Sequence, residues 1–161
     1  MSSVFRLVHA ALDAATDRPL PLGARAPDFA LKNQRGEVVR LADQKGHPVI
    51  LVFYPRDNTP VCSLQLRDFN SETAALSRLG ARVFGINAGS AETHAHFCEK
   101  LALGFDLLVD DGALVARAYQ ATLGPLVQVR RTVYAVDADG IIVFAERGTP
   151  SPAAVLGALH A

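Results

Sequence analysis

The chain has 161 residues, 50% of them hydrophobic, and its 16 basic side chains balance 16 acidic ones. This length suits one domain with a sizeable core, and the balanced charge, without a dense basic patch, argues against nucleic acid as a partner. Two cysteines are too few for a disulfide-stapled secreted scaffold, and their spacing fits no zinc site. No apolar run reaches the roughly 18 residues that a membrane-spanning helix needs. We therefore expect a cytoplasmic protein with reduced cysteines and with no metal, cofactor or membrane anchor.

Residues 1–22 predict an N-terminal extension, and residues 23–161 the domain itself. The extension is either a weak amphipathic helix or a loose tail, and it makes a poor signal peptide because His9 and Asp13 break its short apolar part. Two short alternating runs within residues 26–41 flank Asn33-Gln-Arg-Gly36, which predicts a β-hairpin. A turn then leads into Val49–Tyr54, whose continuous apolar composition predicts a buried strand.

From Thr59 the pattern becomes helical, with apolar residues at spacings compatible with a 3.6-residue period up to a glycine cap at Gly80. Downstream, the patterns predict a strand over 82–86, a helix from Ser90 to about Leu103 ended by Gly104, a strand over 105–109 and a brief helix over 110–119. A looser segment over 120–129 precedes an antiparallel hairpin over 131–145, and Ser151-Pro152 begins a last helix.

This order of elements places the chain in the α/β class. It predicts a mixed sheet flanked by helices, parallel in the middle and antiparallel at one end. A thioredoxin-like domain has this order of elements.

The loop after the first core strand carries the clearest chemical signal. Thr59 occupies the N-cap position of the helix, Pro60 the first helical position and Cys62 the third. The unpaired N–H groups and the dipole of a helix start favour a thiolate over a thiol, and ligands of open α/β sheets bind at such strand ends. We interpret Cys62 as a nucleophile, the alternative being a small buried core residue. Candidate cations that would stabilise its thiolate are Arg56, Arg67, Arg130 and Arg131.

The string Pro55-x-x-x-Thr59-x-x-Cys62 after an apolar strand resembles the active-site motif of the peroxiredoxins. Its wider context is most similar to the peroxiredoxin Q (bacterioferritin comigratory protein) subgroup. The stretch Gly23-x-x-Ala26-Pro-Asp-Phe29 resembles the entry to the first hairpin of that family, and Arg131-Thr-Val-Tyr-Ala-Val-Asp137-x-x-Gly140 resembles its arginine-bearing hairpin. The resemblance therefore covers the chain from about Gly23 to the C-terminus.

The resemblance implies a thioredoxin-like fold with an N-terminal β-hairpin, and a thiol peroxidase. By it, Cys62 is the peroxidatic cysteine, which attacks a hydroperoxide and becomes a sulfenic acid. Thr59 would hydrogen-bond the peroxide or the thiolate, Pro55 would shield the site, and Arg131 would hold the thiolate charge and polarise the O–O bond. The substrate would be hydrogen peroxide or an organic hydroperoxide, the reductant thioredoxin or a glutaredoxin, and the protein a monomer or weak dimer.

Many members of the subgroup place a resolving cysteine five residues after the first, where this chain has Arg67. The remaining cysteine, Cys98, lies in the next helix, where some members carry theirs; the alternative is a small buried side chain. Cys98 lies roughly 12 Å into its helix, and a disulfide needs Cα atoms within about 7 Å, so we expect separated cysteines in the reduced fold. Bonding would require the first turn, around Thr59–Leu66, to unwind. His94, one turn before Cys98, is expected on a solvated helix face.

Three alternative functions stay open at this point. The first is a one-cysteine peroxidase, in which Cys98 takes no part. The second is a thiol–disulfide exchanger of the same fold, which is disfavoured because it needs C-x-x-C and Thr59 occupies the first of those positions. The third is a redox-sensing binding module with little reactivity toward peroxide.

Overall fold

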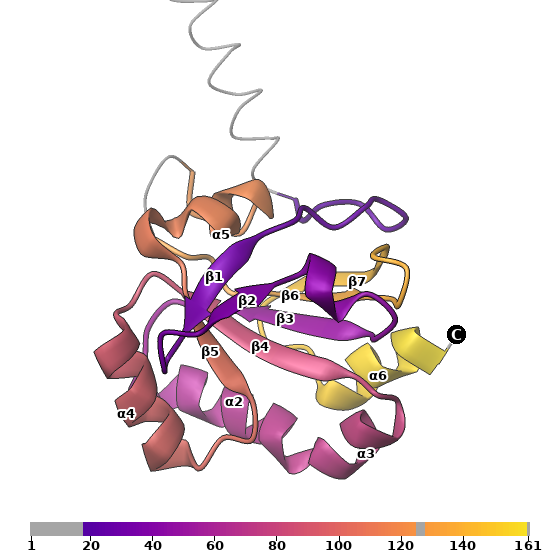
Figure 1. Ribbon diagram of the computed structural model, residues 1–161. Helices are drawn as coiled ribbons and strands as arrows, with labels where there is room; N and C mark the ends of the chain where they lie inside the picture. The colour runs from indigo at the N-terminus through magenta and orange to yellow at the C-terminus, as the bar shows by residue number, and fades with distance from the viewer. Residues whose placement is uncertain (1–17, 125–127, 161) are drawn as a thin grey trace, which may run out of the picture.

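The structure is a computed structural model that describes residues 18–124 and 128–160 (Figure 1). Within these residues the centre is a seven-stranded sheet in the order β2-β1-β5-β4-β3-β6-β7. The strands are β1 (Ala30–Asn33), β2 (Val38–Arg40), β3 (Val49–Phe53), β4 (Arg82–Asn87), β5 (Asp106–Val109), β6 (Thr132–Val136) and β7 (Ile142–Arg147). The helices are α2 (Pro60–Ser71), α3 (Thr73–Arg78), α4 (Ala91–Leu101), α5 (Leu114–Ala118) and α6 (Pro152–His160), with 3-10 turns η1 (Ala42–Gln44) and η2 (Asp111–Ala113).

The sheet is parallel in its middle, where β3 pairs with β4 and β4 with β5. On one side the hairpin of β6 and β7 pairs antiparallel with β3, as the sequence predicts. The hairpin of β1 and β2, whose place in the sheet the sequence did not predict, joins the other side of the sheet antiparallel to β5. The mixed sheet with flanking helices and an N-terminal hairpin is the predicted thioredoxin-like arrangement.

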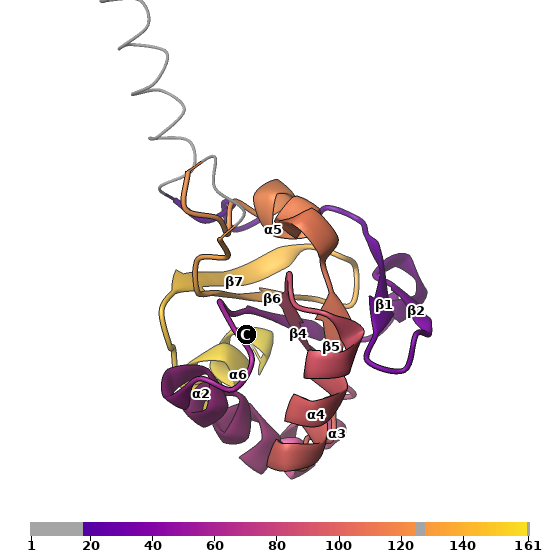
Figure 2. The ribbon, with the colours of Figure 1, turned by 90° about the vertical axis from the view of Figure 1, so that its left-hand side faces the viewer.

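Both faces of the sheet are buried, which explains the unbroken apolar run of β3. Alternate residues of β3 join two separate cores, one beneath α5 and one beneath α2, α4 and α6. Figures 1 and 2 show α5 on one side of the sheet and α2, α3, α4 and α6 on the other. Tyr119 lies in the first core and Phe97 in the second, both fully buried as expected. The carboxyl end of β3 thus emerges between two covered faces, directly before α2.

The predicted helix from Thr59 to Gly80 is two helices with a break at Glu72. At the break the hydroxyls of Ser71 and Thr73 donate to the backbone carbonyls of Asp68 and Asn70, local bonds that compete with a continuous helix. Among the described residues, no helix has the length and apolar character that a membrane crossing requires.

The end of α4 also differs from the prediction. Ala102, with φ of 50°, takes the left-handed position that ends the helix, two residues before the predicted Gly104.

The expected extension over residues 1–22 lies mostly outside the described residues, which begin at residue 18. Its last part is attached to the domain, since the backbone N–H of Leu20 donates to the hydroxyl of Tyr134 at 2.9 Å. The N–H of Gly23 donates to the carbonyl of Ile142, also at 2.9 Å. A boundary between residues 22 and 23 stays a prediction.

Candidate active site

Cys62 lies in the first turn of α2, at the carboxyl end of β3, and is 1% exposed. Thr59 has the extended backbone of an N-cap, and its carbonyl accepts from the N–H of Ser63 at 2.9 Å. Its hydroxyl makes no capping bond and instead donates to the carbonyl of Arg56 at 3.3 Å. The first N–H groups of α2 therefore have no side-chain cap, so they can stabilise negative charge in the loop.

Arg131 brings a positive charge to the sulfur of Cys62. Its Nη2 donates to Cys62 Sγ at 3.2 Å, and the residue directly precedes β6. Strand β6 pairs with β3 in a register that sets Thr132 opposite Phe53, so the guanidinium is carried to the loop that follows β3. A guanidinium in this position stabilises negative charge that develops on the sulfur. Among the four candidate arginines, Arg131 is the one for which this contact is seen.

Gln65 fixes the orientation of Arg131. The amide Oε1 of Gln65 accepts from Arg131 Nη1 at 2.8 Å, and its Nε2 donates to the carbonyl of Gly148 at 3.3 Å. The N–H of Gly148 in turn donates to the carbonyl of Arg131 at 3.0 Å. Gln65 is only 3% exposed. Within the described residues, no carboxylate lies in ion-pair range of Arg131, so its charge is left to act on the sulfur.

Gln65 was not predicted as a site residue, although its position in the sequence carries a signal. It follows Cys62 by three residues, which places both side chains on one face of α2.

Pro55 lies half-buried at the start of the loop, on the rim of a hollow of about 370 Å³ that Asn87 and Gly89 also line. Val61, next to the cysteine in the sequence, is 54% exposed, whereas the cysteine itself is 1% exposed. The loop therefore buries the sulfur of Cys62 while its outer side borders open space.

His94 is fully buried, and the expectation of a solvated helix face is wrong. Its Nδ1 lies 2.6 Å from Asp57 Oδ2, and its Nε2 lies 2.9 Å from the carbonyl oxygen of Leu108. The sequence held a usable signal: His94 lies at i, i+3 and i+7 spacing with the core residues Phe97 and Leu101, which places it on the buried stripe of α4.

Asp57 also accepts hydrogen bonds from two other side chains. Its Oδ1 accepts from the hydroxyl of Tyr54 at 2.6 Å and from Nδ2 of Asn87 at 3.2 Å. Burial by itself would raise the pKa of this carboxyl, but the hydrogen bonds from His94 and Tyr54 outweigh burial and lower the pKa. Asp57 is thus an ionised carboxylate at neutral pH.

Cys98 lies one turn after His94 on α4 and is partly buried. Burial, followed by the negative charge of Asp106, raises the pKa of its thiol to about 11. Both cysteines are free, so they are not bonded to each other. The structure brings Arg131 into contact with Cys62, with Thr59 directly before α2 and Pro55 two residues after β3, while Cys98 lies on another helix as a thiol that is protonated at neutral pH.

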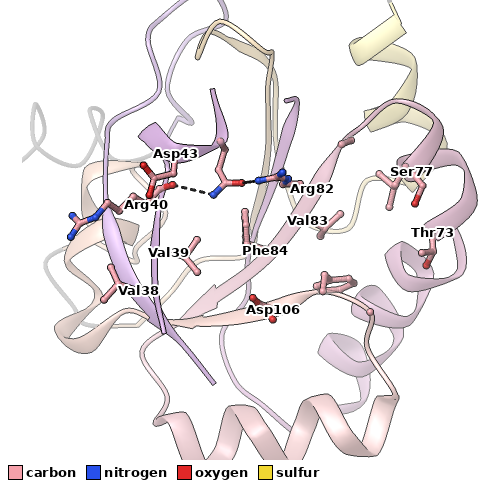
Figure 3. A pocket seen from close by; sticks show the side chains of 15 residues that line it. Val38, Val39, Arg40, Asp43, Thr73, Ser77, Arg82, Val83, Phe84 and Asp106 are labelled. Atoms are coloured by element: carbon pink, nitrogen blue, oxygen red, sulfur yellow. Dashed lines mark hydrogen bonds between the residues drawn. The ribbon is translucent and has the colours of Figure 1, made fainter. Parts of the chain in front are cut away.

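A larger hollow, of about 430 Å³, lies elsewhere, between β2, β4 and α3. Figure 3 shows Val38, Ser77, Arg82 and Asp106 around it, with Arg82 hydrogen-bonded to Gln44. None of the predicted site residues lines this hollow. In the part of the chain that the structure describes, no group of three or more histidine, cysteine or acidic side chains could hold a metal ion.

The chain matches known proteins over most of its length. The model of the AhpC/TSA family matches residues 22–145. Peroxiredoxin Bcp of Bacillus subtilis is 35% identical over 130 residues, which cover 77% of this chain and 83% of that protein. The chain also matches the chloroplastic peroxiredoxin Q of rice at 36% identity, but spans only 57% of that longer protein.

Solved structures give the same picture. Peroxidoxin BcpB of Mycobacterium tuberculosis has a TM-score of 0.81 at 27% identity, covering 88% of this chain and 97% of that one. The bacterioferritin comigratory protein of Xanthomonas campestris, described for its alkyl peroxide reduction activity, has a TM-score of 0.78 at 27% identity, covering 89% and 98%.

Proposed function

Because this chain belongs to the AhpC/TSA family and is a thiol-dependent peroxidase of the peroxiredoxin Q and Bcp type, we propose that Cys62 is its peroxidatic cysteine. One observation carries this assignment: a buried sulfur in the first turn of a helix has the guanidinium of Arg131 at 3.2 Å. This arrangement supplies the two things that the reaction needs, a stabilised thiolate and a positive charge at the point where the O–O bond breaks.

The reaction is a transfer of one oxygen atom from peroxide to sulfur. The thiolate of Cys62 attacks the terminal oxygen of the hydroperoxide, an S–O bond forms and the O–O bond breaks. The leaving oxygen takes a proton and departs as water or an alcohol, so the peroxide is reduced while Cys62 is oxidised to a sulfenic acid. Arg131 is placed to stabilise first the thiolate and then the charge on the leaving oxygen.

Thr59 and Pro55 complete the proposed peroxide site. The Thr59 hydroxyl makes only a long bond, 3.3 Å to the carbonyl of Arg56, which it can exchange for a bond to a bound peroxide. Pro55 has no N–H group, and it covers the end of β3 without adding a donor that would compete for the substrate.

We propose Cys98 as the resolving cysteine. Its thiolate would attack the sulfenic sulfur of Cys62, so that the S–S bond forms while the S–O bond breaks, and the leaving hydroxide takes a proton and departs as water. Cysteine-to-serine variants of the X. campestris peroxiredoxin Q have been made at two positions with the same separation as Cys62 and Cys98 here, 36 residues (98 − 62). With a pKa of about 11, folded Cys98 is almost entirely a thiol at neutral pH, so we expect it to react after local opening has exposed it to water.

A thioredoxin-type reductant returns the enzyme to its dithiol state, and we propose thioredoxin or a glutaredoxin. Both hydrogen peroxide and organic hydroperoxides are proposed substrates, the latter supported by the activity described for the X. campestris protein. A cytoplasmic location and a monomer or weak dimer remain the expectations for this chain.

The test compares wild type, Cys62→Ser and Cys98→Ser in stopped-flow peroxide reduction, with thioredoxin as the donor. We expect Cys62→Ser to lose peroxide reduction, and Cys98→Ser to react once with peroxide and then stall. Full thioredoxin-linked turnover by Cys98→Ser would make this a one-cysteine enzyme. Peroxide reduction by Cys62→Ser at the wild-type rate would refute the assignment of the nucleophile.

A further inference from the structure

The active-site loop is held in place by side chains. Residues 55–58 make no backbone–backbone hydrogen bond to the rest of the described chain. Asn58 has a left-handed backbone, with φ of 61°, and the outer side of the loop borders the hollow of about 370 Å³. Neither the strand ladder nor apolar packing on that side therefore fixes the loop between β3 and α2.

Helix α4 supplies much of what holds the loop. The imidazole of His94 contacts the carboxylate of Asp57 at 2.6 Å, and Nζ of Lys100 donates to Oδ1 of Asn58 at 3.4 Å. The side chains of His94 and Asp57 are 0% and 6% exposed, so this contact is made away from water. Cys98 lies on the same helix, between the two residues that hold the loop.

The hydrogen bonds of His94 define its charge. The carbonyl of Leu108 can only accept, so Nε2, at 2.9 Å, carries a proton. Asp57 already accepts from Tyr54 and Asn87 as an ionised carboxylate, so Nδ1 donates to it and also carries a proton. An imidazole that donates from both nitrogens is an imidazolium, and the contact is a buried ion pair. Opposite charges in such a site attract strongly only while the closed loop excludes water.

We propose that Asp57 and His94 are positioning residues that lock the active-site loop onto α4, and that separation of this ion pair is the event that frees Cys62 to meet Cys98. The proposal rests on the function proposed above, in which these two cysteines form a disulfide. While the ion pair is intact, the loop holds Cys62 beside Arg131 for attack on peroxide. When the ion pair separates, the loop is released and α4, which carries Cys98, is uncovered.

The lock then decides the fate of the sulfenic acid. While the loop stays closed, a second hydroperoxide can transfer its oxygen to the sulfur, its O–O bond breaking to give an alcohol or water and a sulfinic acid on Cys62. Once the loop opens, Cys98 attacks instead and water leaves. A weaker lock favours the disulfide, and a stronger lock favours overoxidation.

The experiment weakens the lock with His94→Gln and with Asp57→Asn, and uses His96→Gln as the matched control because His96 is an exposed imidazole on the same helix. Rapid mixing of reduced enzyme with hydrogen peroxide gives the rate of disulfide formation, and mass spectrometry gives the peroxide concentration that yields sulfinic acid. We expect each lock variant to form the disulfide at least about tenfold faster, since losing one member of a buried ion pair shifts an opening equilibrium by more than that. Overoxidation should require correspondingly more peroxide, and His96→Gln should match wild type.

A merely structural role predicts a different outcome. It would lower the unfolding midpoint of the two variants and leave the disulfide rate and the overoxidation threshold at wild-type values, which would overturn the proposal. The same holds if His96→Gln changes both quantities as much as His94→Gln does. Wild type is measured first. If it forms no disulfide between Cys62 and Cys98, both the proposed function and the proposed lock are refuted. If it does form this disulfide, unchanged rates in the variants refute the lock alone.

A measurement on wild type keeps the proposal falsifiable if a variant does not fold. Nitrogen NMR of the histidine rings should show protons on both nitrogens of His94 in the reduced enzyme at neutral pH, and a changed pattern once the disulfide has formed. A neutral His94 ring in the reduced enzyme, or signals identical in the two redox states, would overturn the lock.

Discussion

The two cysteines of this chain occupy opposite kinds of environment. Cys62 is buried at the start of a helix, with a guanidinium as its hydrogen-bond donor. Cys98 lies well inside a helix, where burial and the nearby carboxylate of Asp106 raise the pKa of its thiol to about 11. A guanidinium faces the first sulfur, whereas burial and a carboxylate disfavour negative charge on the second. We propose that this contrast underlies a division of labour, in which Cys62 reacts with peroxide in the closed fold and Cys98 reacts after the fold has opened locally.

Removal of the positive charge of Arg131 beside Cys62 should have the largest effect on the rate of peroxide reduction. Arg131→Met keeps much of the side-chain volume but removes the donor to the sulfur, so peroxide reduction should slow by about a hundredfold to a thousandfold. The second-order rate constant of Cys62 oxidation, measured by stopped flow, checks this. Arg56→Met, an exposed arginine in the same loop, is the control and should change the rate little. A rate within twofold of wild type for Arg131→Met would contradict the claim that the charge of Arg131 makes the environment of Cys62 differ from that of Cys98.

Removal of the Gln65 amide, which orients the guanidinium of Arg131, should have a smaller effect on the rate of Cys62 oxidation. Gln65→Leu preserves a buried side chain of similar size but removes the bond at 2.8 Å to Arg131, so the same rate constant should fall by about tenfold. Gln65→Glu keeps the acceptor and adds a negative charge beside Arg131, and it should also slow the reaction because the charge of Arg131 is then shared. An unchanged rate in both variants would show that Arg131 needs no orienting partner.

The Cys98 side can be examined through pH. The folded state holds the pKa of this thiol near 11, against an ordinary value of 9.0. Between these two values the unfolded chain releases the proton and the folded chain keeps it, so the free energy of unfolding falls as pH rises. Urea unfolding of the reduced protein should therefore show a loss of stability from pH 9 to pH 11 that is smaller in Cys98→Ser. Equal pH dependence in the two proteins would contradict a penalised thiolate at Cys98.

Much of the fold follows from local signals in the sequence. The unbroken apolar run of β3, the proline that begins α2, and the turn over residues 137–140 are each local signals, and these three elements are present. The antiparallel edge formed by β1 and β5 was missed because it joins residues more than 70 positions apart, such as Lys32 and Val109. Side-chain bonds to the backbone near Glu72 broke a helix whose apolar spacing alone predicted continuity.

The candidate site likewise contains residues that could be predicted from their own segment and residues that only long-range contacts place. Cys62 and Thr59 could be placed from their own segment, whereas Arg131 entered through the family resemblance because strand register decides which arginine reaches the sulfur. Asp57 was not singled out because its partner His94 lies on a helix 37 residues further on. His94 was assigned to solvent although its spacing to Phe97 and Leu101 places it on the buried stripe of α4, because its buried polar partners come from other segments. Polar residues buried by tertiary contacts look like surface residues until the fold supplies their partners.

The most direct test of the division between the two thiols is a single-turnover oxidation. Reduced wild type and Cys98→Ser are each mixed with one equivalent of hydrogen peroxide, quenched with a thiol-blocking reagent and mapped by mass spectrometry. We predict a Cys62–Cys98 disulfide in wild type, and in Cys98→Ser a sulfenic acid confined to Cys62. Oxidation that begins at Cys98, or a Cys62 that stays reduced while peroxide disappears, would contradict the account.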